Sequence, residues 1–385
     1  MRNAIIGIVI GTVVGVVIGA TLLAPQLYDG GNTALATPGV ENLSPPAPAP
    51  APTPAKDPAP RAEAPAVSWK MASAYSGKLP QIGSLAKRLE QETWRISGGQ
   101  MEIRLSEPDT LVPSTEIFDA VASGAIDAAF ASPGLWRDKA PALQLFGAVP
   151  FGPDAVEYLA WIYFGGGREL FDKIYERHGI HSLFCGILGP EASGWFHQQI
   201  LGIEDLRGLK IRIYGLGADV LAKLGAKPRM LGDGEIFPAL ESGAINAAEF
   251  SMPAIDLQLG LHKMAEHYYF PGWHQPVTML ELMVNRSKWE ALSSQAKSQV
   301  EAVCGDNIRY GLAEGAAIQF AALKKIYAEG TKIHRWPPAF LETLEATWAE
   351  VAAERSASDE AFREVWSSLS AFRRDYAIWQ ELASP

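Results

Sequence analysis

A short stretch of alternating apolar and polar residues lies near the middle of the chain. Residues 209–214 read Leu-Lys-Ile-Arg-Ile-Tyr, a period of two that predicts a strand. Gly208 and Gly215 flank it and mark its ends. Arg212 lies near the end of this strand, where open α/β sheets bind ligands. Because a guanidinium can hold a carboxylate through two parallel hydrogen bonds, we expect Arg212 to bind a small carboxylate, with Tyr214 as a neighbour of that ligand.

Strand and helix patterns alternate over most of the chain. Residues 67–73 and 101–105 predict strands, and residues 80–97 between them place apolar side chains on one face of a helix. The alternation continues to about Asn285, which predicts an α/β fold. After Arg286 the pattern is mostly helical, over about 293–329 and, with interruptions, 338–381. Such long C-terminal helices would hold two lobes together.

Two segments of the chain repeat one pattern. Residues 114–132 and 233–251 match at 11 of 19 positions without a gap. In each copy, Ser114 or Asp233 is expected to cap a helix, Gly124 or Gly243 to end it, and a strand to follow. Two copies about 120 residues apart predict two similar lobes that face one cleft.

The two copies differ where their predicted strands end. The first copy has Phe130 at this position and the second has Glu249. An acid at the end of an otherwise apolar strand needs a partner or a cation. Glu249 is therefore a candidate for a binding site, and the alternative is an acid at the surface or paired with a lysine.

The N-terminal residues have a different character. Residues 4–24 form an uncharged apolar run long enough to cross a bilayer of roughly 30 Å. We interpret residues 1–29 as a membrane anchor with the rest of the chain outside the cytoplasm, and a cleaved signal peptide is the alternative. Residues 30–67, rich in proline and alanine, are expected to be a linker, and residues 68–385 a binding domain.

Composition narrows the choice of function. The length of 385 residues favours two lobes. A net charge of -10 argues against nucleic-acid binding, which needs a basic surface. We find no motif for nucleophilic or acid–base catalysis, and so do not expect an enzyme. The two cysteines, Cys185 and Cys304, are expected to be buried free thiols; a disulfide between them is the alternative.

Several separated motifs in the same order resemble a known family. They are residues 208–213 (Gly-Leu-Lys-Ile-Arg-Ile), residues 232–249 and residues 268–276 (Tyr-Tyr-Phe-Pro-Gly-Trp-His-Gln-Pro). They resemble the solute-binding subunits of tripartite ATP-independent periplasmic (TRAP) transporters, and most of all the branch that binds 2-oxo or 2-hydroxy monocarboxylates with a metal ion. The resemblance covers about residues 69–385.

The resemblance implies a two-lobed periplasmic-binding-protein-like fold with a hinged cleft. Lobe I would comprise about 68–189 and 278–317, and lobe II about 190–277 and 318–385. The protein would be periplasmic, tethered to the inner membrane if its N-terminal helix is kept, and would deliver a small carboxylate to a TRAP membrane permease. A homodimer through the C-terminal helix is compatible with the long region 338–381.

The resemblance also implies a set of site residues. Arg212 would hold the ligand carboxylate, and a bridging Na⁺ or Ca²⁺ would be bound by Glu191, Glu249, the carbonyl of Phe250 and Gln275. This chain departs from the branch, which commonly has glutamine at the position of Glu191, often glutamate at that of Gln275, and tryptophan at that of Phe250. Two carboxylates with neutral oxygens would still suit a hard cation.

Other candidates for the site are aromatic or histidine side chains. We expect Tyr75, Tyr214, Phe250 and His274 to lie near the ligand. Of the further aromatics, Trp136, Trp195 and Trp273 fit core packing as well as a pocket wall. His262 and His267 lack the spacing of a metal motif and are expected to be structural. The alternative functions are a carboxylate-sensing module with a signalling partner and a metal-dependent lyase or hydrolase.

Overall fold

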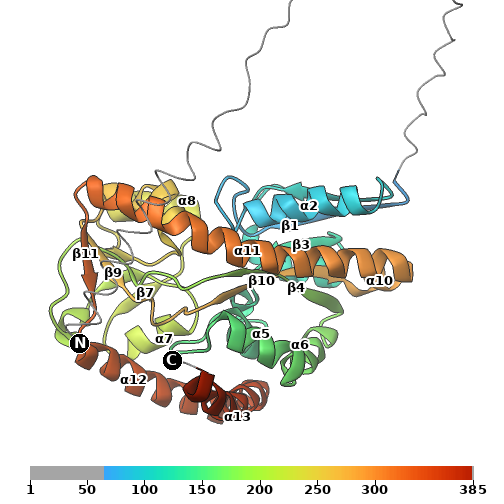
Figure 1. Ribbon diagram of the computed structural model, residues 1–385. Helices are drawn as coiled ribbons and strands as arrows, with labels where there is room; N and C mark the ends of the chain where they lie inside the picture. Colours follow the sequence, from blue (N-terminus) through green and yellow to red (C-terminus); the bar gives the residue numbers. More distant parts are fainter. Residues whose placement is uncertain (1–64, 384–385) are drawn as a thin grey trace, which may run out of the picture. The chain divides into compact units, whose positions relative to one another are not determined.

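The computed structural model describes residues 65–383, which form two β-sheets surrounded by helices (Figure 1). The predicted α/β class is confirmed. The predicted anchor (1–29) and nearly all of the predicted linker (30–67) lie outside the described residues. Within residues 65–383, no helix is both long enough and apolar enough to cross a membrane.

The first sheet has five strands in the order β2-β1-β3-β10-β4. β1 pairs in parallel with β2 and β3, whereas β10 runs antiparallel to β3 and β4. These strands are rich in buried apolar side chains because helices cover the sheet. Their bounds are Val67–Ser73 (β1), Met101–Ser106 (β2), Ala128–Ala131 (β3), Ile180–Leu188 (β4) and Thr278–Asn285 (β10).

The second sheet has six short strands in the order β11-β9-β5-β8-β6-β7. β6 is the strand predicted from the alternation at 209–214, and it pairs in parallel with β7 and β8. The strand bounds are Gly194–Phe196 (β5), Lys210–Arg212 (β6), Lys227–Arg229 (β7), Ala247–Ala248 (β8), His267–Phe270 (β9) and Lys332–Arg335 (β11).

The chain passes between the sheets more than once. Residues 189–193 lead from β4 in the first sheet to β5 in the second, and residues 271–277 lead back from β9 to β10. A third connection is α11 (Ser294–Ala328), a helix of 35 residues that packs on β4 and α2 at one end and on α9 at the other. Figure 1 shows α11 (orange) extending along both sheets.

The other helices cover the faces of the two sheets. α12 packs on α7 and on α13, and α13 continues onto α5 and α6. A short turn at Gly165 and Gly166 joins α5 to α6. The bounds are Ser84–Ile96 (α2), Ile117–Ser123 (α3), Gln144–Gly147 (α4), Ala155–Phe164 (α5), Gly167–Glu176 (α6), Leu216–Lys223 (α7), Asp233–Glu241 (α8), Pro253–Leu259 (α9), Arg286–Glu290 (α10), Pro338–Ser358 (α12) and Glu360–Ala383 (α13), with short 3₁₀ turns at Ser114–Glu116 (η3), Pro133–Trp136 (η4), Pro141–Leu143 (η5), Ile203–Leu206 (η6) and Leu261–Lys263 (η7).

The prediction of free thiols is wrong, because Cys185 and Cys304 form a disulfide. Cys185 lies on β4 and Cys304 on α11, and the close packing of this helix on this strand brings the two Cα atoms to 4.1 Å. Both residues are buried. The bond fixes the first part of α11 to the first sheet.

The two copies of the repeat occupy equivalent places in the two sheets. The first copy forms α3 and β3, and the second forms α8 and β8. Gly124 and Gly243, with φ of 78° and 69°, follow the helices as expected. The capping prediction is wrong for both copies. A 3₁₀ turn precedes α3 with no side-chain cap, and in α8 Gly232 takes the cap position while Glu235 accepts a hydrogen bond from its N–H at 2.8 Å.

Candidate functional site

A small cavity of about 40 Å³ lies between the two sheets. Its wall combines residues that follow strands of the first sheet with residues that follow strands of the second. Space of this size holds a ligand of only a few heavy atoms, since a single water needs about 10–15 Å³ on this measure. The lining residues are Tyr75, Ile82, Leu135, Leu188, Glu191, Arg212, Tyr214, Met230, Phe250, Ser251, Gln275, Thr278 and Leu280.

Arg212 is the only arginine or lysine among these lining residues. It is the last residue of β6 and is 4% exposed. Its Nε donates to the carbonyl of Leu231 at 3.3 Å, and its Nη1 donates to the carbonyl and carboxylate of Glu249 at 2.5 and 3.2 Å. The guanidinium also lies 4.8 Å from the ring centroid of Phe250. The protein therefore fixes one arm of the guanidinium, and the side chain is positioned before any ligand binds.

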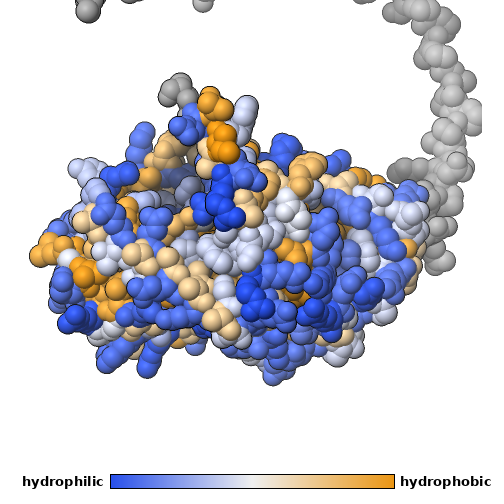
Figure 2. All heavy atoms as spheres, turned by 90° about the horizontal axis from the view of Figure 1, so that it is seen from below, coloured by the Kyte–Doolittle hydropathy of each residue, from blue (hydrophilic) through white to orange (hydrophobic). Residues whose placement is uncertain are grey.

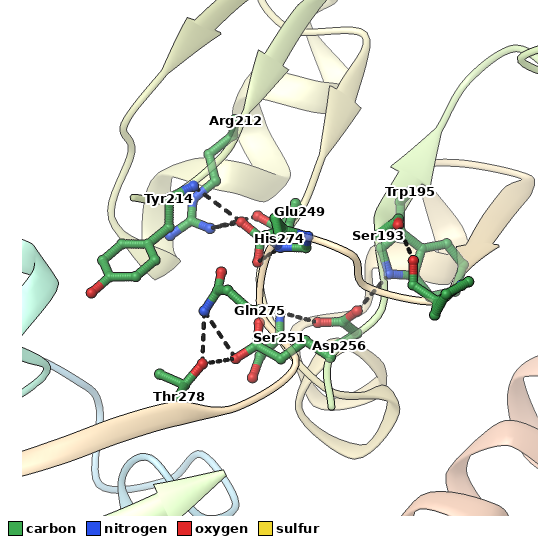
Figure 3. Close-up of polar contacts among 12 residues, drawn as sticks. Ser193, Trp195, Arg212, Tyr214, Glu249, Ser251, Asp256, His274, Gln275 and Thr278 are labelled. Carbon is green, nitrogen blue, oxygen red and sulfur yellow. Dashed lines mark hydrogen bonds and ion pairs between the residues drawn. The ribbon is translucent and has the colours of Figure 1, made fainter. Parts of the chain in front are cut away.

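Glu249 follows β8 directly and is fully buried. Its Oε2 accepts hydrogen bonds from Arg212 and from the backbone N–H of Tyr214, at 3.2 and 3.1 Å (Figure 3). Within residues 65–383 its Oε1 has no hydrogen-bond partner, and it lies 3.4 Å from Nε2 of His274. Burial alone would raise the pKa of this carboxyl, but His274 and Arg212 outweigh burial, so the pKa is lowered. Glu249 is thus a buried carboxylate whose Oε1 faces His274 without a hydrogen bond.

A second buried carboxylate, Glu191, lies on the segment that joins the two sheets. Its Oε1 accepts hydrogen bonds from Thr278 Oγ1 at 2.8 Å and from Gln275 Nε2 at 3.2 Å. Its Oε2 and the Oε1 of Gln275 have no hydrogen-bond partner among the described residues. Burial and the negative charge of Glu249 raise the pKa of Glu191 well above its usual range.

The donor set of these residues fits a hard cation. One potential ligand atom each from Glu191, Glu249 and His274 lie within 4.8 Å of one another. The Oε2 of Glu191 and the Oε1 of Gln275 are buried without a hydrogen-bond partner among the described residues, and the Oε1 of Glu249 makes no hydrogen bond although His274 lies beside it. Such burial is costly unless a cation or a donor reaches these oxygens. Carboxylate and amide oxygens are the ligands that Ca²⁺ and similar hard cations prefer. His274 adds a nitrogen beside this oxygen set.

The structure brings most of the predicted ligand neighbours together. Tyr75, Glu191, Arg212, Tyr214, Phe250 and Gln275 all line the cavity. Glu249 and His274 do not line it, but Glu249 contacts both Arg212 and His274 (Figure 3). The hydroxyl of Tyr214 does not end in the cavity, however, but makes a hydrogen bond to Ser132.

The remaining candidates lie elsewhere in the described chain. His262 pairs with Glu329 and His267 with His334, so both are structural as expected. The three tryptophans do not line the cavity. Trp136 donates to Glu281, Trp195 stacks on Tyr268, and Trp273 stacks on Phe151.

The sequence did not point to several residues of the site. Leu135 lines the cavity from the short 3₁₀ turn η4 and Met230 from the loop after β7, and neither position has a recognisable sequence pattern. Thr278 supports Glu191 but resembles any other first residue of a strand. Asp256 is buried behind the cavity, where it accepts hydrogen bonds from the N–H of Ser251 at 3.2 Å and from Trp195 and Tyr268 at 2.9 Å each, and burial raises its pKa to about 7. The one signal in the sequence that could have pointed to Asp256 is an acid without an evident partner in an apolar stretch.

Known proteins are similar to this chain in sequence and in fold. The profile of a family described as bacterial extracellular solute-binding protein, family 7, matches residues 71–359. The monocarboxylate 2-oxoacid-binding periplasmic protein of Nostoc sp. is 33% identical over 325 residues, which are 84% of this chain and 88% of that protein.

Solved structures agree with this assignment. A TRAP transporter solute-binding protein from Bordetella bronchiseptica, described as a mixed-occupancy dimer with calcium and picolinate, has a TM-score of 0.81 at 33% identity, covering 83% of this chain and 95% of that one. Relatives from Colwellia psychrerythraea, with calcium and pyruvate, and Pseudoalteromonas atlantica, with sodium and pyruvate, have TM-scores of 0.78 at 33% and 30% identity, each covering 82% of this chain and 97% of the other.

These matches confirm the predicted two-lobed periplasmic-binding-protein fold and the resemblance on which it was based. The strand arginine and the glutamine after Gly-Trp-His line one cavity between the two sheets of that fold, and the acid that follows β8 pairs with this arginine. The chain belongs to the extracellular solute-binding proteins of family 7, the solute-binding subunits of TRAP transporters.

Proposed function

We propose that this protein captures a small 2-oxo or 2-hydroxy monocarboxylate outside the cytoplasm, together with a Na⁺ or Ca²⁺ ion, and delivers it to a TRAP permease. The observation that carries the proposal is the cavity of about 40 Å³ in which Arg212 faces the buried, unpaired oxygens of Glu191 and Gln275. The calcium or sodium with pyruvate in the Colwellia and Pseudoalteromonas relatives supports the same ligand class.

In this proposal the residues of the site have separate roles. Arg212 binds the ligand carboxylate with the part of its guanidinium that Glu249 leaves free. Glu191, Glu249, the Phe250 carbonyl and Gln275 would hold the cation. A bound Na⁺ or Ca²⁺ would supply positive charge for the carboxylate and its α-oxygen. Tyr75 and Phe250 exclude water, which strengthens the charge interactions once the lobes close.

The hinge would lie in the segments that join the sheets. We place lobe I at about 68–189 plus 278–317 and lobe II at about 190–277 plus 318–385, so that Glu191 and Gln275 belong to the crossing segments themselves. We assign binding and release without turnover, a periplasmic location, and an N-terminal tether. Fractionation of cells that express the full chain, with the N-terminus of the isolated protein sequenced, tests the tether.

We also propose a homodimer through the end of α13. Ile378, Trp379 and Leu382 are 62%, 63% and 79% exposed there, and the Bordetella relative is described as a dimer. Figure 2 shows separate hydrophobic patches on an otherwise mostly hydrophilic face. Light scattering after size-exclusion chromatography should give a dimer mass for the wild type and a monomer mass for Trp379→Lys.

Native mass spectrometry of the purified protein tests the main proposal. We expect a small carboxylate and one cation to co-purify, and calorimetry with pyruvate or lactate in calcium or sodium buffer to show binding. Recovery of the unchanged acid, followed by NMR, separates binding from turnover. A chain that binds neither acid in either buffer would contradict the proposal.

A further inference from the structure

The side chain of Tyr214 crosses from the second sheet to the first. Tyr214 follows β6, yet its hydroxyl lies 2.9 Å from Oγ of Ser132, which directly follows β3 of the first sheet. Both residues are buried. A buried hydrogen bond between two residues 82 positions apart therefore joins the two halves of the fold beside the ligand cavity.

Two glycines make room for this hydroxyl. A Cβ added at Gly134 would lie 2.0 Å from Oη and 2.8 Å from Cζ of Tyr214, and one added at Gly147 would lie 2.9 Å from the same Oη. Neither glycine has the left-handed backbone that other residues avoid, so backbone conformation does not require them. Gly134 in particular meets only Tyr214 among its nearest atoms. Space for the Tyr214 side chain is thus the physical reason for glycine at 134.

The segment that surrounds this hydroxyl, with Ser132 and Gly134, is attached to the first sheet. Ser132 and Gly134 lie in or next to the 3₁₀ turn η4, and Trp136 at its end donates from Nε1 to Glu281 of β10 at 2.8 Å. Glu281 is fully buried and also accepts hydrogen bonds from Tyr175 and Ser182. The turn that receives the Tyr214 hydroxyl is therefore anchored to the first sheet by buried hydrogen bonds.

The backbone of Tyr214 faces the other way. Its N–H donates to Oε2 of Glu249 at 3.1 Å, so a single residue touches both the candidate cation ligand and the opposite sheet. Its side chain also forms part of the wall between the ligand cavity and a second cavity of about 210 Å³, because Tyr214, Leu135 and Met230 line both.

We propose that Tyr214 is a latch that closes the two lobes when its hydroxyl enters the slot formed by Ser132, Gly134 and Gly147. The ring closes the wall of the ligand cavity, and the backbone N–H holds Glu249 in place, so that the occupied site and the closed state favour each other. This assignment rests on the proposed function for its ligand, but the latch itself is a contact of the chain alone. It makes Tyr214 a positioning residue.

Single-molecule FRET in the full-length chain tests the latch. Dyes are placed on Thr110→Cys and Glu241→Cys, exposed positions in the first and second lobes; the native cysteines are bonded to each other and do not react. The ratio of closed to open molecules is measured in buffer alone and with calcium chloride and pyruvate. The variants are Tyr214→Phe and Gly134→Ala, and the matched control is Gly305→Ala, where an added Cβ meets no atom within 4 Å.

We expect Tyr214→Phe, which loses one hydrogen bond, to lower the closed-to-open ratio about five- to tenfold. Gly134→Ala should lower it about a hundredfold, because the methyl group occupies the position of the hydroxyl. Gly305→Ala should behave as wild type. In a Tyr214→Ala chain, Gly134→Ala should have little further effect, since the clash is gone.

Two results would overturn the latch. One is a Gly134→Ala chain that closes as fully as wild type, and the other is an equal loss from Gly134→Ala with and without the Tyr214 ring. If calcium and pyruvate leave the wild-type ratio unchanged, the proposed ligand is wrong. The latch is then judged in buffer alone, where Gly134→Ala must still lower the closed-to-open ratio for the latch to stand.

Discussion

Arg212 and Glu249 form a buried pair in which one guanidinium nitrogen, Nη1, donates to both the backbone carbonyl and the carboxylate of the same glutamate. The two side chains are 5% and 0% exposed. Since Arg212 ends β6 and Glu249 directly follows the neighbouring parallel strand β8, the sheet itself sets their spacing. The positive charge that would bind a ligand is thereby held by the negative charge that would bind a cation.

The planar guanidinium of Arg212, and not its charge alone, should be needed for ligand binding. Arg212→Lys keeps the charge but loses the planar fork and the bonds to Glu249 and Leu231, so affinity for pyruvate should fall about 10- to 100-fold. Calorimetry at a fixed calcium concentration measures the change. Arg229→Lys is the matched control, because Arg229 pairs with Arg212 in register on β7 but does not line the ligand cavity. Equal affinity in Arg212→Lys and wild type would exclude the carboxylate role.

A second prediction concerns the cation. Chelation of calcium in sodium-free buffer should weaken pyruvate binding at least about tenfold, because the buried Oε2 of Glu191 and Oε1 of Gln275 would then face the ligand carboxylate without a cation between them. Returning calcium or sodium should restore affinity. Glu249→Gln should abolish this dependence, whereas Glu241→Gln, on the exposed face of α8, should keep it. Affinity that is indifferent to chelation would remove the cation from the proposal.

We expect the wall between the two cavities to limit the size of the ligand. Met230→Ala would open the cavity of about 40 Å³ towards the neighbouring one of about 210 Å³. The affinity for 2-oxopentanoate relative to pyruvate should then rise about tenfold. Leu201→Ala, a truncation of a 76% exposed side chain, is the control. An unchanged ratio would show that Met230 does not limit ligand length.

Stability should depend on pH through Glu281. Burial raises its pKa to about 7 in the folded chain, although Ser182, Tyr175 and Trp136 donate hydrogen bonds to it. Between about pH 4.5 and pH 7 the folded state holds a proton that the unfolded state has lost, so the free energy of unfolding falls as pH rises through this window.

The variant Glu281→Gln lacks this titration. Its stability relative to wild type should therefore improve by about 3 kcal/mol from pH 4.5 to pH 7, because one pKa unit corresponds to about 1.4 kcal/mol. Urea unfolding at a series of pH values measures the difference. Glu241→Gln, at an exposed position, should run parallel to wild type. A constant difference between Glu281→Gln and wild type would show that Glu281 does not titrate in this range.

Reduction of the disulfide should destabilise the protein. The Cys185–Cys304 bond spans 119 residues, and in the chain-entropy account a loop of this size contributes about 4–5 kcal/mol. Cys185→Ala/Cys304→Ala should unfold at lower urea concentration than wild type and lose all response to dithiothreitol. A wild-type chain that ignores dithiothreitol throughout its unfolding transition would contradict this prediction.

Sequence reasoning reached the parts of the site that follow strands. Period-two patterns located β6, and comparison of the two repeats located Glu249, because an acid in a buried strand end stands out against Phe130 in the other copy. Leu135, Met230 and Thr278 could not be found in this way. Their places depend on how loops from the two sheets meet, and no local pattern records that distance.

The wrong predictions, for the cysteines and for the helix caps, have different causes. Whether Cys185 and Cys304 are bonded depends on the packing of α11 on β4, which composition cannot show. The capping errors are local: Gly232 with Glu235 satisfies the start of α8, so the acid at 233 is already inside the helix. Tyr214 lines the cavity, but its hydroxyl could not be assigned to Ser132 without both sheets in view.

The Cys185–Cys304 bond has a topological consequence. The strands β5 to β9 all lie between the two cysteines in the sequence. Most of the second sheet is therefore an insertion, and the disulfide joins the two ends of this insertion at the first sheet. A protease that cuts any loop of this insert therefore releases no fragment, and the nicked chain keeps its mass until a reductant separates the pieces. The same geometry makes these loops natural places to open the chain for circular permutation or for the insertion of a reporter domain.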